Sequence, residues 1–130
     1  MPKNKSGNKT EKKKVLIIED EKPMAQALEL KLKHAGFSTK AVYNGSDGVD
    51  ILLEETFDII LCDLIMPKMD GFTVLAILKE RKIKTPIIVL TNLSQKLDEK
   101  YAKEFGAKEF FIKSNTSLEK IVERVIEILK

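Results

Sequence analysis

Short apolar runs alternate with amphipathic segments along this chain, and the alternation predicts its strands. Three runs, at residues 15–18, 59–62 and 87–90, contain no polar residue. Unbroken runs of this length are typical of strands buried on both faces of a parallel sheet. Residues 38–43 alternate in part between polar and apolar side chains, as an edge strand does, and a shorter run completes the series at 109–112. The sequence thus predicts five strands.

Five amphipathic segments follow these strands and predict five helices. The first, residues 23–35, places apolar side chains at helical spacing between a proline suited to a first turn and a glycine suited to a C-terminal stop. The others are expected at residues 46–55, from 71 to about 81, at 94–105 and at 117–130. The last helix opens on Thr116-Ser117-Leu118-Glu119, a pattern typical of a capping box.

Five consecutive β–α pairs without an internal repeat predict a three-layer α/β fold, in which helices cover both faces of a five-stranded parallel sheet. The three fully apolar runs should be central strands, whereas the mixed segment at 38–43 should be peripheral. This pattern favours the strand order 2-1-3-4-5 of the flavodoxin-like, doubly wound type. Strands one and three are then neighbours at the switch point, where ligands bind in such sheets.

Polar residues directly follow four of the predicted strands. Glu19 and Asp20 follow the first strand, and Asp63 follows the third. Thr91 and Lys113 follow the fourth and fifth. Because the carboxyl ends of parallel strands meet at one edge of the sheet, we expect these side chains to lie together. Clustered carboxylates repel one another unless a cation shares the site, and Mg²⁺ prefers such oxygen ligands. The set therefore predicts a magnesium-assisted phosphoryl site with an aspartate as the acceptor.

Four short motifs mark these strand ends. They are Glu19-Asp20-Glu21-Lys22-Pro23, Asp63-Leu64-Ile65-Met66-Pro67-Lys68-Met69-Asp70-Gly71, Val89-Leu90-Thr91 and Phe110-Phe111-Ile112-Lys113. In this order they resemble the receiver domain of response regulators in two-component signalling, and in particular a stand-alone receiver of the chemotaxis-regulator type. The resemblance covers residues 14–130, so we expect one receiver domain there, preceded by a tail at residues 1–13.

The resemblance implies a set of magnesium ligands. Asp20 and Asp63 would bind Mg²⁺ directly, Glu19 would bind it through a water molecule, and Ile65 would contribute its backbone carbonyl. Asp70, by contrast, is expected to cap the following helix and not to bind the metal.

The resemblance also implies the acceptor and the switch. Asp63 would attack phosphorus as a carboxylate nucleophile and become an aspartyl phosphate. Lys113, together with Mg²⁺, would neutralise the phosphoryl oxygens. Thr91 would donate its hydroxyl to the new phosphoryl group and draw its loop inward, and Phe110 would turn inward with it.

Three residues depart from the usual receiver pattern. Glu19 stands where aspartate is commoner, which suits a water-mediated contact with the metal. Asn92 follows Thr91 where a small residue is usual, and it is expected to narrow access to the acceptor. Ser114 follows Lys113 where proline in a cis peptide is usual. Because a cis bond before a residue other than proline costs roughly 2.5–4 kcal/mol, we expect a trans bond and a reshaped loop.

The net charge of +3 comes from the N-terminal tail. Six of the 23 basic residues but only one of the 20 acidic residues lie in the first 14 positions. A segment so poor in apolar residues is expected to be disordered, and it lacks the aromatic residues of single-strand nucleic-acid binders. We therefore expect no nucleic-acid binding. No apolar run approaches the roughly 18 residues of a membrane span, so we expect no membrane insertion. The N-terminus lacks the apolar stretch of a signal peptide, so we expect a cytoplasmic location. The single cysteine, Cys62, is expected to be a core residue.

The leading interpretation is a phosphorylation-activated signalling switch that catalyses only its own phosphorylation and dephosphorylation. Its donor would be a histidine kinase or a phosphotransfer protein. Output to an unidentified protein, or to a second copy in a homodimer, is expected through the helix at 94–105, the strand at 109–112 and the last helix. The apolar stripe of that last helix is wider than one sheet contact needs, and Ile128 is the residue expected to face a partner.

Three other functions remain open. A magnesium-dependent phosphatase of the haloacid-dehalogenase type also uses a strand-end aspartate, but it needs an acid two residues later, where Ile65 stands. A flavodoxin-like cofactor binder would need small phosphate-binding residues in the first loop, where Glu19-Asp20-Glu21 stands. A degenerate receiver would act only as a protein-interaction scaffold, and the complete set of strand-end residues argues against it.

Overall fold

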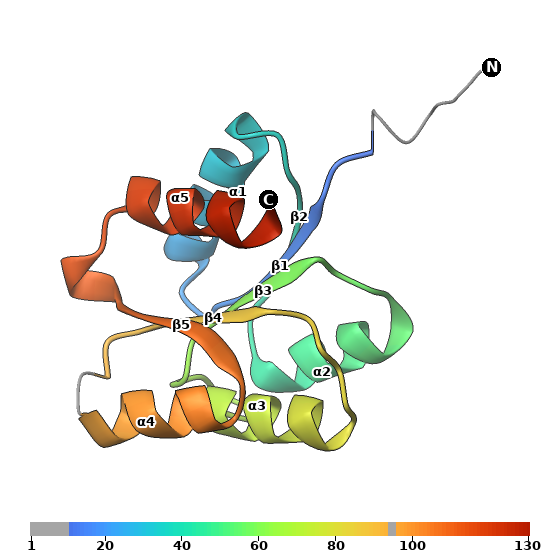
Figure 1. Cartoon of the computed structure of the whole chain (residues 1–130), viewed down its shortest axis with the longest axis vertical. Coiled ribbons are helices and arrows are strands. Elements are labelled where there is room, and N and C mark those ends of the chain that lie inside the picture. Colours follow the sequence, from blue (N-terminus) through green and yellow to red (C-terminus); the bar gives the residue numbers. More distant parts are fainter. Residues whose placement is uncertain (1–10, 94–95) are drawn as a thin grey trace.

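All five predicted strands are present and pair in parallel within one sheet. The structure is a computed structural model that describes residues 11–93 and 96–130 (Figure 1). Its strands are β1 Lys14–Ile18, β2 Ser38–Val42, β3 Ile59–Cys62, β4 Ile87–Thr91 and β5 Ala107–Ile112. They lie in the order β2-β1-β3-β4-β5, as predicted.

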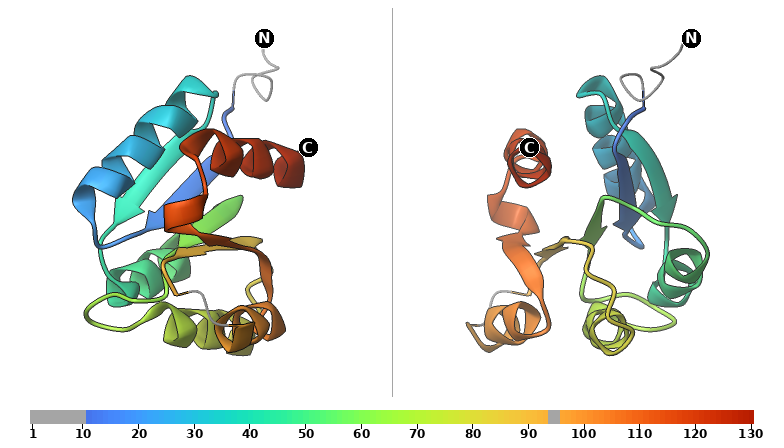
Figure 2. Two further views of the ribbon diagram at one scale, coloured as in Figure 1. Left: turned by 90° about the vertical axis from the view of Figure 1, so that its left-hand side faces the viewer. Right: turned by 45° about the vertical axis from the view of Figure 1, so that its right-hand side comes forward.

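Helices cover both faces of this sheet. They are α1 Lys22–His34, α2 Gly45–Glu54, α3 Gly71–Glu80, α4 Lys96–Glu104 and α5 Leu118–Leu129. Figures 1 and 2 show α1 and α5 on one face, and α2, α3 and α4 on the other. A short 3₁₀ turn, Lys113–Asn115, connects β5 to the segment before α5.

The central strands supply alternate side chains to two apolar cores. Leu16, Ile60 and Val89 pack beneath α2, α3 and α4. Ile17 and Leu61 pack on the opposite face, beneath α1 and α5. These side chains are almost completely buried, which explains why residues 15–18, 59–62 and 87–90 of the central strands are all apolar.

Register between β1 and β3 places two acids side by side. Ile18 and Cys62, the last residues of the two strands, are directly paired. The Asp63 amide donates to the Ile18 carbonyl, and the Glu19 amide donates to the Val42 carbonyl on the other side of β1, both at 3.0 Å. The backbone ladder therefore continues one residue past each strand and fixes Glu19 and Asp63 at its edge.

The described element boundaries agree with the sequence prediction to within two residues. The capping box predicted for the last helix differs, because Ser117 and not Thr116 is its N-cap, and Ser117 accepts from the Lys120 amide. The Thr116 hydroxyl instead donates to the Ile112 carbonyl at 2.8 Å, which ties it to the preceding turn. The expected start of α4 at residue 94 lies outside the described residues, as do residues 1–10 of the tail that was predicted to be disordered over residues 1–13.

None of the helices in the described part of the chain combines the length and the apolar character that crossing a bilayer requires.

As predicted, Asp70 caps α3, accepting from the Thr73 amide at 2.9 Å.

Candidate functional site

Three carboxylates meet where β1 and β3 end. Glu19, Asp20 and Asp63 each offer an oxygen atom, and these atoms lie within 4.8 Å of one another. Glu19 and Asp63 are buried, with exposed fractions of 2% and 5%, whereas Asp20 is accessible. Hard oxygen donors at this spacing fit a Mg²⁺ ion, and the mutual repulsion of the three carboxylates favours a cation at this position.

Lys113 reaches into this acidic cluster from the end of β5. Its Nζ lies 2.8 Å from Glu19 Oε1, 2.8 Å from Asp63 Oδ2 and 3.0 Å from Glu21 Oε1. Burial opposes the charge of the ammonium, but the hydrogen bonds to Asp63, Glu19 and Glu21 outweigh it and raise the pKa of Lys113. The lysine therefore stays protonated and neutralises part of the cluster.

Burial also opposes the charge of Glu19. It raises the pKa of this carboxyl, although hydrogen bonds from Lys113 and from the Glu21 amide lower it in part. The Glu21 amide donates to Glu19 Oε2 at 3.0 Å. Glu19 thus depends on a lysine and a backbone donor to remain ionised in its buried position.

Two backbone amides hold Oδ1 of Asp63, the carboxylate oxygen that does not face Lys113. Asp63 Oδ1 accepts from the Leu64 amide at 2.6 Å and from the Ile65 amide at 3.3 Å. This leaves Oδ2 directed at Lys113. The carboxylate is therefore oriented before any ligand arrives, which reduces the ordering that a reaction at this atom would require.

The loop after Asp63 is held tightly by a glycine. The Gly71 amide donates to the Leu64 carbonyl at 2.9 Å. A Cβ atom at Gly71 would lie only 2.1 Å from the Asp63 carbonyl oxygen and 2.7 Å from Leu64 Cα. Only glycine allows α3 to begin so close to the acceptor, and this contact explains the glycine at the end of the Asp63 motif.

The acidic cluster opens into a pocket of about 310 Å³. Its lining residues come from four loops at the carboxyl edge of the sheet: Asp20, Glu21, Asp63, Ile65, Thr91, Asn92, Leu93 and Lys113. Thr91 ends β4 and is fully buried, and its hydroxyl accepts from the Leu93 amide at 3.4 Å. Phe110 is 9% exposed and packs in the core beneath α2, α3 and α4. Leu93 is partly buried against the same core.

The structure brings the predicted strand-end residues into one site, and it adds contacts that the sequence did not predict. Glu21, which belongs to the first motif but had no assigned role, pairs with Lys113. The Ser114 amide donates to Asn92 Oδ1 at 3.2 Å, so two of the departures from the receiver pattern contact each other. The expected trans bond before Ser114 is confirmed, since none of the described peptide bonds is cis.

Cys62 behaves as the predicted core residue. Burial, together with the charges of Asp63 and Glu19, raises the pKa of its thiol, which therefore stays protonated beside the acidic cluster. It is 1% exposed.

Solved structures of receiver domains share this fold. The receiver domain of a signal transduction histidine kinase from Syntrophus aciditrophicus is 32% identical, with a TM-score of 0.81 over 90% of this chain and 89% of that one. A Francisella response regulator receiver domain is 27% identical, with a TM-score of 0.85 over 90% and 96%. A receiver domain protein from Methanospirillum hungatei, 19% identical, has a TM-score of 0.86 over 92% and 94%, a likeness of fold alone.

A parallel sheet in the order 2-1-3-4-5, with an acidic cluster and a lysine at its carboxyl edge, defines the class of receiver-like signalling domains. The family model of the response regulator receiver domain matches residues 15–126. The chain therefore belongs to the response regulator receiver domain family of two-component systems. Domains of this family interact with histidine kinases and with output domains.

Proposed function

We propose that this receiver is a phosphorylation-activated switch that accepts a phosphoryl group on Asp63 from a histidine kinase or a phosphotransfer protein. The observation that carries the proposal is the environment of Asp63. Its carboxylate is anchored on one oxygen by two amides and lies 2.8 Å from the Lys113 ammonium on the other. A carboxylate nucleophile with a fixed cation beside it is suited to attack phosphorus and to hold the product.

The proposed metal site uses the same cluster. Asp20 and Asp63 would bind Mg²⁺ directly, Glu19 would bind it through water, and the Ile65 carbonyl would complete the protein ligands. When bound, the metal would neutralise charge on the phosphoryl oxygens as the bond to phosphorus forms. Because Lys113 already pairs with Glu19 and Asp63, its ammonium would share these carboxylates with the metal.

The proposed switch links the phosphoryl group to the rest of the domain. Lys113 would bind one phosphoryl oxygen, and the Thr91 hydroxyl, which now accepts from Leu93, would donate to another. This change would move the loop after β4. Phe110, whose side chain is already buried with 9% exposed, lies on the neighbouring strand β5 and would repack with that loop.

The proposed output surface consists of α4, β5 and α5. Three large apolar side chains on its helices are exposed: Leu97 at 58%, Tyr101 at 48% and Ile126 at 41%. Ile128, the residue expected to face a partner, is partly buried against the core beneath α1 and α5. Ile126, on the same helix, is exposed instead. Ile126 is therefore the better candidate on α5 for contact with an output protein or a second copy.

Two alternatives are less well supported. A phosphatase would need a general acid near Asp63, but the side chain two residues later is Ile65, which is 59% exposed in the pocket. A scaffold without phosphoryl chemistry has no need for Lys113 to be buried beside two buried acids.

Intact-mass measurement after incubation with acetyl phosphate and Mg²⁺ tests the proposal. The parent chain should gain one phosphoryl group, and Asp63→Asn should gain none. Asp50→Asn, which removes an exposed acid on α2, is the matched control and should react like the parent. An adduct that persists in Asp63→Asn, or that survives mild alkali, would contradict the assignment of an aspartyl phosphate at this position.

A further inference from the structure

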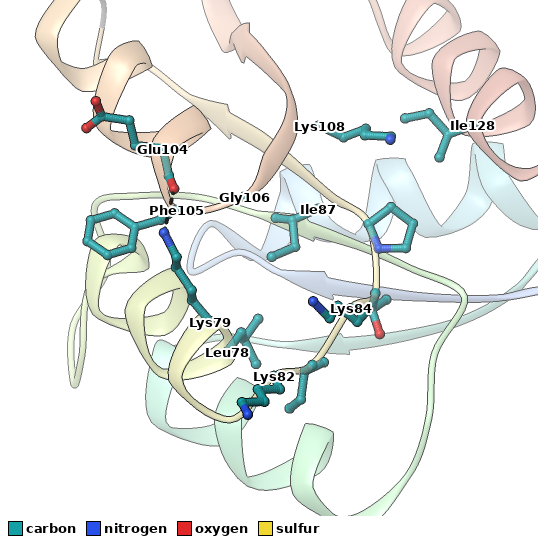
Figure 3. A pocket seen from close by; sticks show the side chains of 13 residues that line it. Leu78, Lys79, Lys82, Lys84, Ile87, Glu104, Phe105, Gly106, Lys108 and Ile128 are labelled. Atoms are coloured by element: carbon teal, nitrogen blue, oxygen red, sulfur yellow. Dashed lines mark hydrogen bonds between the residues drawn. The ribbon is translucent and has the colours of Figure 1, made fainter.

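A second pocket lies where β4 and β5 begin, at the opposite end of the strands from Asp63. Figure 3 shows it between the ends of α3 and α4 and the beginnings of β4 and β5. It has a volume of about 490 Å³, within the usual range for ligand sites. Its lining residues are Leu78, Lys79, Lys82, Ile83, Lys84, Thr85, Pro86, Ile87, Glu104, Phe105, Gly106, Lys108 and Ile128.

The interior of this pocket is apolar. Leu78 and Ile87 are nearly fully buried and belong to the core. Phe105 is partly buried against the same core, and Ile128 of α5 reaches the pocket from the other layer. An apolar group of a ligand would therefore find apolar side chains to pack against there.

Lysines surround this apolar interior. Four lysines but only one acidic residue line the pocket. Lys79 is accounted for by the fold, because its Nζ donates to the Glu104 carbonyl at the end of α4 and lies 5.5 Å from the Phe105 ring centroid. Lys82, Lys84 and Lys108 are exposed, and among the described residues none of them pairs with a carboxylate.

The helix ends determine where an anion can sit. The last carbonyls of α3 and α4, which end at Glu80 and Glu104, give this edge a partial negative charge. An anion deep in the pocket would be repelled, whereas an anion at the lysine tips would be attracted. A fitting ligand thus places an apolar group inside and carboxylates outside. None of the described residues that line the pocket is an arginine, which favours such separate contacts over the paired hydrogen bonds of a phosphate group.

We propose that this pocket binds an acidic peptide segment of a protein partner, with one apolar side chain of the segment inserted between Ile87, Phe105 and Ile128. Glutamates or aspartates on either side of the inserted residue would pair with Lys84 and Lys108, which flank the pocket in Figure 3. The binding does not require phosphorylation, because neither the acidic cluster nor Lys113 takes part.

Titration of isotope-labelled protein with a short capped peptide tests the proposal. The peptide carries one phenylalanine flanked on both sides by glutamates, and amide NMR shifts report its location. The shift changes should centre on Ile87, Gly106 and Ile128. Two control peptides, one with serine for phenylalanine and one with glutamines for glutamates, should both bind more weakly, because each lacks one of the two contacts.

Charge reversal on the protein separates this pocket from general electrostatic attraction. Lys84→Glu with Lys108→Glu should weaken peptide binding by about tenfold or more, since two favourable pairs become repulsive. Lys40→Glu with Lys100→Glu changes the net charge equally on exposed residues outside the pocket, and it should leave binding within about twofold of the parent.

Several results would overturn the proposal. They are no shift change at the pocket at millimolar peptide, equal binding of the serine peptide, or equal weakening by both double variants. Vesicles of phosphatidylcholine and phosphatidylserine provide the remaining comparison. If the pocket lysines are needed for vesicle binding but not for peptide binding, the surface recognises a membrane and the peptide proposal is wrong.

Discussion

Replacing Lys113 by methionine tests how far one ammonium group stabilises the acidic cluster. The substitution keeps most of the side-chain volume but removes the cation that lies 2.8 Å from both Glu19 and Asp63. Side chains of all three residues are at most 9% exposed, so water cannot simply replace the lost charge. Removing one partner of such a buried pair typically costs about 3–5 kcal/mol.

Protonation sets an upper limit on this loss. A carboxyl with an ordinary pKa near 4.3 can be neutralised at pH 7 for roughly 3.7 kcal/mol, and at pH 5.5 for roughly 1.6 kcal/mol. Burial already raises the pKa of Glu19, and the ammonium of Lys113 partly offsets this by lowering it. Removing Lys113 should therefore raise the pKa of Glu19 further. A carboxyl whose folded-state pKa is raised favours the folded state at low pH and opposes it as the pH rises through that pKa. The deficit of the variant should therefore shrink between pH 7 and pH 5.5.

Urea unfolding followed by circular dichroism measures this deficit. We expect Lys113→Met to lose about 2–4 kcal/mol of unfolding free energy at pH 7, and clearly less at pH 5.5. Lys108→Met, at an exposed position in β5, is the control and should lose less than about 0.5 kcal/mol. Adding Mg²⁺ should restore part of the loss in Lys113→Met, because a ligand that binds only the folded state stabilises it. A deficit below about 0.5 kcal/mol, or one equal at both pH values, would refute the reasoning.

Three further predictions concern other parts of the site. Asp20→Asn should weaken Mg²⁺ binding in calorimetry by roughly tenfold or more, because a charged oxygen ligand is lost, and unchanged affinity would remove Asp20 from the metal site. Gly71→Ala should destabilise the domain by more than about 2 kcal/mol, because its Cβ would overlap the Asp63 backbone. Gly36→Ala is the control, because Gly36 has a positive φ but no close neighbour, and it should lose only about 1 kcal/mol of unfolding free energy. Equal losses in the two variants would show that the close approach at Gly71 is unimportant. Ile65→Asn with Leu93→Glu should speed loss of phosphate from the phosphorylated chain. Both native side chains line the acceptor pocket and offer an attacking water no hydrogen bond. An unchanged rate would show that they do not set the lifetime of the phosphorylated state.

The sequence predicted the sheet well because burial on both faces leaves a simple pattern. β1, β3 and β4 lie in the middle of the sheet, and their apolar runs follow directly from that position. The meeting of Glu19, Asp20 and Asp63 could also be predicted, since strand order and parallel pairing determine which strand ends are neighbours.

Contacts that depend on side-chain reach could not be predicted in the same way. Glu21 pairs with Lys113, 92 positions along the chain, and the spacing of the first motif carries no trace of that contact. The N-cap of α5 lies at Ser117 because a hydrogen bond to Ile112 draws Thr116 back into the preceding turn. Three of the four lysines of the second pocket lie close together at residues 79–84, but the fourth, Lys108, reaches the same surface from β5, and the sequence alone does not predict that meeting.

The hydrogen bond between Asn92 and Ser114 has a consequence for how relatives of this domain diverge. It joins the residues that follow Thr91 and Lys113, and it exists because residue 114 is not proline and keeps its amide hydrogen. A single such bond contributes about 1 kcal/mol, or roughly a fivefold change in the balance between two loop arrangements. Substitution at either position would alter that balance while every acid of the cluster stays in place. Substitutions at these two positions are therefore expected to change the preferred loop arrangement without changing the acidic cluster itself.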